Sequence, residues 1–229
     1  MAIKFLPALI CIVWLGACTN DPSQDATSGT NASPNAEVVA TPDSAAKPAS
    51  NIATRAPFKN IMDIMMQDMH SLTLTNDPDQ DFALMMKRHH QAAIEMANLE
   101  ITKGERESFK ALARKIMEDA RKDINELNTF LSGYKPAKNT GFSKKAMEAM
   151  MKSTSNAKWE DSSAIDWQFF QLMSLHHRQG IEMAKVYLTY ASQEPTKKVA
   201  QRVLKTNEAD ISKLNDAVLN ANEKAESRP

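Results

Sequence analysis

Apolar residues recur every three or four positions along most of the chain between residues 58 and 220. This spacing places apolar side chains on one face of a helix and is typical of amphipathic α-helices. No convincing alternation with a period of two appears, so we expect an all-α fold. Cap and turn residues divide the segment into six predicted helices, over residues 58–71, 79–103, 105–131, 142–153, 162–192 and 196–219.

The predicted helix boundaries coincide with glycine, proline and capping residues. Gly104, Gly133 and Gly141 fall between the periodic segments, where glycine commonly ends a helix. Asn76-Asp77-Pro78 is typical of an N-cap followed by proline in the first helical turn, and Glu194-Pro195 is interpreted in the same way.

The helical segment contains two similar halves at a constant offset of 87 residues. Residues 82–97 and 169–184 both begin with phenylalanine, contain a His-His pair and end in Ile-Glu-Met-Ala. The third helix of each half aligns at the same offset, with Asp123 matching Asp210. Because a repeat at fixed offset identifies the architectural unit, we expect two three-helix halves, residues 58–133 and 142–220. Each half leaves an apolar face open, so the halves should pack together as one bundle.

The first 17 residues are typical of a lipoprotein signal peptide. Lys4 precedes an apolar run over residues 5–16 that is too short to span a bilayer. The run ends in Leu15-Gly16-Ala17-Cys18, which resembles the lipobox of bacterial lipoproteins. The resemblance implies cleavage before Cys18 and lipidation of its thiol. We therefore expect a periplasmic protein anchored by lipid, and Thr19 favours the outer membrane in a Gram-negative host.

The composition limits the classes of function. Residues 18–57 are rich in small and polar residues and predict a flexible tether, and residues 221–229 a polar tail. Lysine plus arginine equals aspartate plus glutamate at 28 each, which gives no basic excess to suggest nucleic acid. Cys11 lies in the signal peptide and Cys18 would be lipidated, so any soft metal ligand in the mature domain must be methionine.

Histidine and methionine are paired along the helices. Because side chains four residues apart on a helix lie next to each other, such a pair can grip one ion. Thioether and imidazole together favour Cu(I), and imidazole also serves Cu(II) and zinc. Four of the five histidines have a methionine four residues earlier, in the pairs Met66/His70, Met85/His89, Met86/His90 and Met173/His177.

The combined motif resembles the signature of the family known as domain of unknown function 305. Those proteins are secreted or periplasmic, are described as ferritin-like, and include members linked to copper binding and resistance. By position, the resemblance implies a ligand set of Met86, His89, His90, Met96, Met173, His176, His177 and Met183. The chain departs from the family pattern before each His-His pair, where Arg88 and Leu175 replace proline. It departs again in the third helices, where Asp123 and Asp210 occur in a region that favours glutamine and glutamate.

We therefore expect an extracytoplasmic copper-binding protein, not an enzyme, that sequesters copper or passes it to a partner. A pH below about 6 should weaken binding, because imidazoles must be neutral to bind copper. Glu95 and Glu182 are either acceptors that orient an imidazole or solvated charges.

Two alternatives remain at this point. A ferritin-like di-iron oxidase needs Glu-x-x-His motifs, whereas the positions three before the histidine pairs hold Met86, Lys87, Met173 and Ser174. A metal-free helical interaction module would use the methionine stripes simply as core.

Overall fold

The computed structural model describes residues 56–155, 157, 158, 160 and 162–226, with side chains as far as residue 220. Cys18, the signal peptide and most of the predicted tether lie outside the described residues. Within the described part of the chain, six α-helices form and there is no strand, which confirms the all-α class. No helix in this part is long and apolar enough to cross a membrane. The helices are α1 Pro57–Ser71, α2 Pro78–Lys103, α3 Glu107–Gly133, α4 Phe142–Ser155, α5 Ile165–Leu188 and α6 Glu194–Glu226.

Two helices differ clearly from the predicted bounds. α5 ends at Leu188 rather than at residue 192, because the buried carboxylate of Asp79 accepts hydrogen bonds from the backbone N–H groups of Ser192 and Gln193. α6 continues to Glu226 rather than ending at residue 219. After residue 219 the chain contains neither glycine nor proline until Pro229, so no residue there interrupts the helix.

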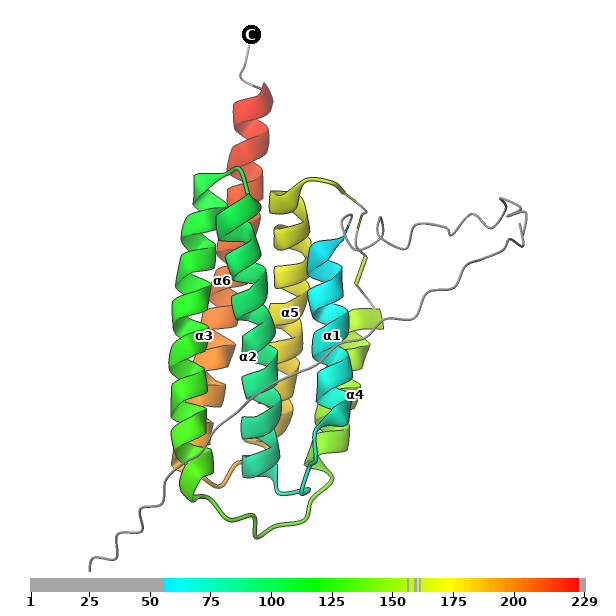
Figure 1. Ribbon diagram of the computed structural model, residues 1–229, viewed down its shortest axis with the longest axis vertical. Helices are drawn as coiled ribbons and strands as arrows, with labels where there is room; N and C mark the ends of the chain where they lie inside the picture. Colours follow the sequence, from blue (N-terminus) through cyan, green and yellow to red (C-terminus); the bar gives the residue numbers. More distant parts are fainter. Residues whose placement is uncertain (1–55, 156, 159, 161, 227–229) are drawn as a thin grey trace, which may run out of the picture. The chain divides into compact units, whose positions relative to one another are not determined.

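The second and third helices of each half pack against the equivalent helices of the other half. α2 lies against α5 and α3 lies against α6, while α1 and α4 flank α2 and α5 (Figure 1). At the offset of 87 residues, α5 is the repeat of α2 and α6 is the repeat of α3. Equivalent helices therefore meet at the centre of the bundle, where a residue and its repeat partner can touch.

Three buried aspartates determine where α2 begins. Asp77 is the N-cap, with Pro78 in the first turn as expected, and its carboxylate accepts from the N–H groups of Asp79 and Gln80. Asp77, Asp79 and Asp81 are all fully buried. They also join α2 to the surrounding loops and to α4 and α5, through donors on Thr75, Asn76, Tyr134, Ala137, Lys138, Ser143, Tyr187, Ser192 and Gln193. Burial alone raises the pKa of Asp79, but these hydrogen bonds outweigh it and leave the pKa below its usual value.

Candidate metal centre

The two copies of the first histidine meet at the centre of the bundle. His89 of α2 and His176 of α5 are separated by 87 residues, and their rings stack with centroids 3.7 Å apart. His176 Nε2 lies 2.8 Å from the backbone oxygen of His89. Because a carbonyl oxygen can only accept, Nε2 carries the proton, and Nδ1 of neutral His176 holds a lone pair.

Several ring nitrogens of this cluster are buried without a hydrogen-bond partner in the described part of the chain. They are Nδ1 and Nε2 of His89, Nδ1 of His176, and both ring nitrogens of His177. Burial first, and then the neighbouring histidines, holds the pKa of His89 and of His177 well below its usual range. Burial also lowers the pKa of His176, to about 3. These imidazoles are therefore neutral at pH 7, which is the form that binds a metal.

Gly180 makes room for the His89 ring. A Cβ atom added at Gly180 would lie 3.0 Å from Cε1 of His89 and 2.8 Å from the side-chain nitrogen of Asn207. The first half has Ala93 at the equivalent position. The sequence alone does not assign a role to Gly180. A glycine inside a predicted helix is a visible signal, but the reason for it is the contact with His89, which only the structure shows.

The predicted methionine ligands lie in the same apolar core as the histidines. Met86, Met173 and the other buried members are completely inaccessible to solvent and belong to one continuous core cluster. Met86 and Met173 lie about one helical turn before the first histidine of each pair. Met96 and Met183 lie about two turns after it. The buried members are Met85, Met86, Met96, Met173 and Met183.

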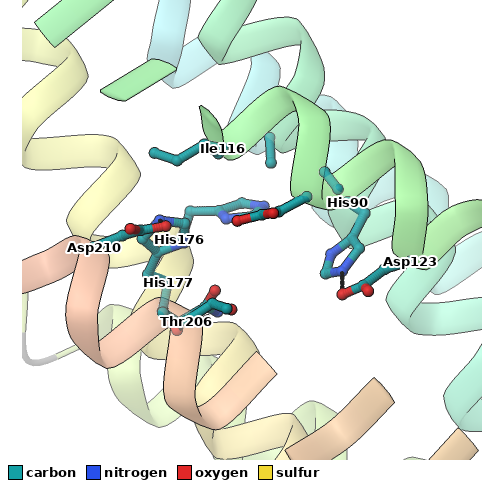
Figure 2. Close-up of a pocket in the computed structure, with 11 residues that line it drawn as sticks. His90, Ile116, Asp123, His176, His177, Thr206 and Asp210 are labelled. Atoms are coloured by element: carbon teal, nitrogen blue, oxygen red, sulfur yellow. Dashed lines mark hydrogen bonds and ion pairs between the residues drawn. The ribbon is translucent and has the colours of Figure 1, made fainter. Parts of the chain in front are cut away.

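The second histidine of each pair faces a small cavity between the halves. The cavity has a volume of about 20 Å³, enough for about one water molecule. In Figure 2, His90 and Asp123 lie on one side, and His176, His177 and Asp210 lie on the other. His90 Nε2 is 2.9 Å from Asp123 Oδ2, whereas His177 Nε2 is 4.0 Å from Asp210 Oδ2.

Other candidate residues lie apart from this centre. His70 is exposed on α1, and its Nδ1 donates to the backbone oxygen of Met66 over 2.7 Å. Glu95 contacts Arg88 and Gln91, and Glu182 pairs with Lys185. The two glutamates are therefore partly exposed charges, and the carboxylates facing the histidines are those of Asp123 and Asp210.

Within the part of the chain that the structure describes, carboxylate and imidazole groups alone do not form a metal-ligand set. Among the described residues, no three His, Cys, Asp or Glu side chains are grouped so that they could hold one metal ion. The imidazoles converge chiefly as the His89–His176 stack, with thioethers on adjacent turns of the same helices.

Together, the fold and the site define a duplicated helical bundle with paired histidines at its centre and methionines around them. The family model for the domain of unknown function DUF305 matches residues 20–131 and, overlapping, residues 79–218. The chain belongs to this family. No curated protein matches the chain.

The solved structures to which this chain is similar include those of CopM and of a DUF305 fragment. CopM in the Cu(I)-bound form is 27% identical, covering 62% of this chain and 96% of that chain with a TM-score of 0.48. CopM in the Cu(II)-bound form is 26% identical, covering 62% and 97% with a TM-score of 0.48. The DUF305 fragment from Deinococcus radiodurans is 19% identical, covering 62% and 96% with a TM-score of 0.47.

Proposed function

We propose that this protein binds copper outside the cytoplasm, with Cu(I) favoured, and either sequesters the ion or passes it to a partner. The ligands are imidazole nitrogens of the two histidine pairs, His89-His90 and His176-His177, together with thioether sulfurs of the flanking methionines. Copper is cargo in this proposal, and the protein carries out no chemical conversion.

The unpartnered ring nitrogens of His89 and His176 carry the proposal. A buried polar atom left without a hydrogen bond costs about 1–3 kcal/mol, and native proteins keep few such atoms without a functional reason. Here three ring nitrogens of two stacked, neutral imidazoles are in that condition, among the described residues. Each neutral ring has one nitrogen with a lone pair, and a soft cation that accepts these lone pairs would offset part of this cost.

The methionines make Cu(I) the favoured ion. Thioether sulfur is a soft ligand that selects Cu(I) over harder divalent ions, and it cannot be lost to protonation. Met86 and Met173, like their neighbours in the core, are shielded completely from water. The surrounding bundle would therefore exclude competing ligands and oxidants from the ion.

The proposal also includes a cellular location and a membrane anchor, both based on the first residues of the chain. We place the protein in the periplasm with a lipid on Cys18, supported by the lipobox-like Leu15-Gly16-Ala17-Cys18. The Cys18→Ser variant should lose incorporation of radiolabelled palmitate and move to the soluble fraction. Palmitate labelling that persists in this variant would contradict the assignment.

A Cu(I) competition titration against a chromophoric chelator tests the copper site. The variant His89→Ala/His176→Ala should lose at least about tenfold in affinity, equal to about 1.4 kcal/mol. Met86→Leu/Met173→Leu, which nearly conserves core volume, should also weaken binding. His70→Ala is the matched control, because His70 is exposed and lies apart from the cluster. Wild-type affinity in the double histidine variant, with its helical circular dichroism intact, would overturn the site.

A further inference from the structure

The two repeat-related aspartates at the cavity differ in their contacts with the histidines. Asp123 of α3 and Asp210 of α6 are separated by 87 residues, and both are nearly fully buried. Asp123 is in hydrogen-bond contact with His90 at 2.9 Å. Asp210 is 4.0 Å from His177, beyond hydrogen-bond distance, and both ring nitrogens of His177 lack a partner among the described residues.

Arg202 accounts for the contact in the first half. Its guanidinium reaches from α6 to α3, where Nε lies 2.7 Å from Asp123 Oδ1 and Nη2 lies 2.6 Å from Glu126 Oε2. The planar guanidinium can contact two carboxylates at once. One oxygen of Asp123 thus binds Arg202. The other faces His90 (Figure 2).

The second half lacks this arrangement because three positions differ between the repeats, one of them Glu126, whose equivalent is Lys213. The residue equivalent to Arg202 is Lys115, which pairs with Asp119 on its own helix instead of reaching Asp210. The residue equivalent to Asp119 is Thr206, so Arg202 meets no competing carboxylate one turn along α6. Asp210 is instead contacted by Lys213 at 3.0 Å.

We infer that Asp123 is a positioning residue that keeps a proton on Nε2 of His90, so that Nδ1 is the nitrogen left to bind a metal ion. A carboxylate accepts from Nε2–H and leaves the lone pair on Nδ1. His177 has no such partner and can bind through either nitrogen. The two halves therefore present unequal imidazoles, and the unequal metal binding that follows rests on the proposed copper function.

Long-range ¹H–¹⁵N NMR of the imidazoles in the full-length, metal-free protein tests the tautomers directly. His90 should show a protonated Nε2 and an unprotonated Nδ1. Asp123→Asn should shift His90 towards a mixture of tautomers, and the matched variant Asp210→Asn should leave the His177 spectrum unchanged. An unaltered His90 tautomer in Asp123→Asn would overturn the inference.

A second variant tests the role of Arg202 without touching Asp123. Thr206→Asp places a carboxylate one turn from Arg202, as Asp119 is placed relative to Lys115. It should draw the guanidinium away and disturb the His90 tautomer, even though Thr206 belongs to the other half. If the His90 tautomer is unchanged, Arg202 does not hold Asp123 in position.

Copper titration separates this inference from the proposed function. Asp123→Asn should lower copper affinity by about 10- to 100-fold, the usual effect of removing the partner of a metal-bound histidine, and Asp210→Asn should lower it less. Equal losses in both variants would overturn the unequal roles. If wild type shows the predicted tautomer but binds no copper, the proposed function fails while the positioning of His90 by Asp123 stands.

Discussion

Single residues at the centre of the bundle are specialised by contacts with the opposite half. Gly180 on α5 leaves space for the ring of His89 on α2, and His176 donates to the His89 backbone oxygen. The imidazole of His176 is therefore fixed by a hydrogen bond. Both ring nitrogens of His89 lack a partner among the described residues. A methyl group at position 180 would disturb the pair directly.

Gly180→Ala should lower copper affinity without the usual gain in stability. Alanine in place of glycine inside a helix normally stabilises by about 1 kcal/mol. Here the new Cβ would press on the His89 ring and the Asn207 side chain. We expect a melting temperature no higher than wild type and weaker Cu(I) binding. A variant with a higher melting temperature and unchanged affinity would show that the ring does not need this space.

Glu100 should destabilise the fold as the pH rises. Burial, and then the nearby Asp166 carboxyl, raises the pKa of Glu100 to about 8. The unfolded chain loses this proton near the ordinary value of 4.5, so the stabilising contribution is complete below that pH and is lost as the pH rises towards 8. In urea unfolding, Glu100→Gln should gain on wild type between pH 5 and 8, by at most about 1.4 kcal/mol per pH unit. A difference that is constant with pH would contradict this assignment.

Among the helices, α2 makes contacts with most of the others. Its first turn is fixed by three buried aspartates, its middle carries His89 and His90, and its last turn carries Glu100. It packs against α1, α3 and α5. The registration of α2 against the surrounding loops therefore controls the placement of both histidines.

Asp79→Ala should destabilise the protein by about 3 kcal/mol or more, since it leaves several buried donors unsatisfied. Chemical denaturation at pH 7 measures the loss. Asp63→Ala is the matched control, because the Lys59–Asp63 pair is exposed and such pairs contribute at most about 1 kcal/mol. Since the pKa of Asp79 is lowered from 3.8, its ionic contribution is present above that pH and lost as the pH falls below it. Equal losses in the two variants would contradict the anchoring role.

The positions of the helices could be predicted because they follow from local signals. Apolar spacing located all six helices, and Asn76-Asp77-Pro78 marked the start of α2 correctly. The end of α5 could not be predicted, because it depends on Asp79, more than 100 residues away. In the same way, the repeat identified Asp123 and Asp210 as equivalent, but only packing shows that one contacts its histidine and the other does not.

For the molecule as a whole, burial of the histidines affects both the pH dependence of copper binding and the stability of the fold. The sequence led us to expect that binding would weaken below pH 6. In the folded protein, however, the pKa of His176 is about 3, and those of His89 and His177 are well below 6.5. Burial therefore favours the neutral, metal-binding form of these rings in the folded protein.

Copper affinity should therefore fall less between pH 7 and 5 than exposed imidazole ligands would allow, whereas stability of the metal-free protein should fall. The unfolded chain protonates these histidines near pH 6.5, while the folded state keeps them neutral. Their contribution is thus complete above pH 6.5 and is lost as the pH falls, by at most about 1.4 kcal/mol per pH unit for each histidine. Competition titrations and urea unfolding at pH 5, 6 and 7 measure the two quantities. Affinity that falls tenfold per pH unit would contradict burial of neutral rings.

X-ray absorption spectroscopy of the Cu(I)-loaded protein tests most directly whether the bundle holds copper through imidazole and thioether. We expect sulfur scatterers bound to copper together with the multiple-scattering pattern of imidazole. The sulfur signal should diminish in Met86→Leu/Met173→Leu. A spectrum of nitrogen and oxygen scatterers alone, unchanged in that variant, would contradict the account.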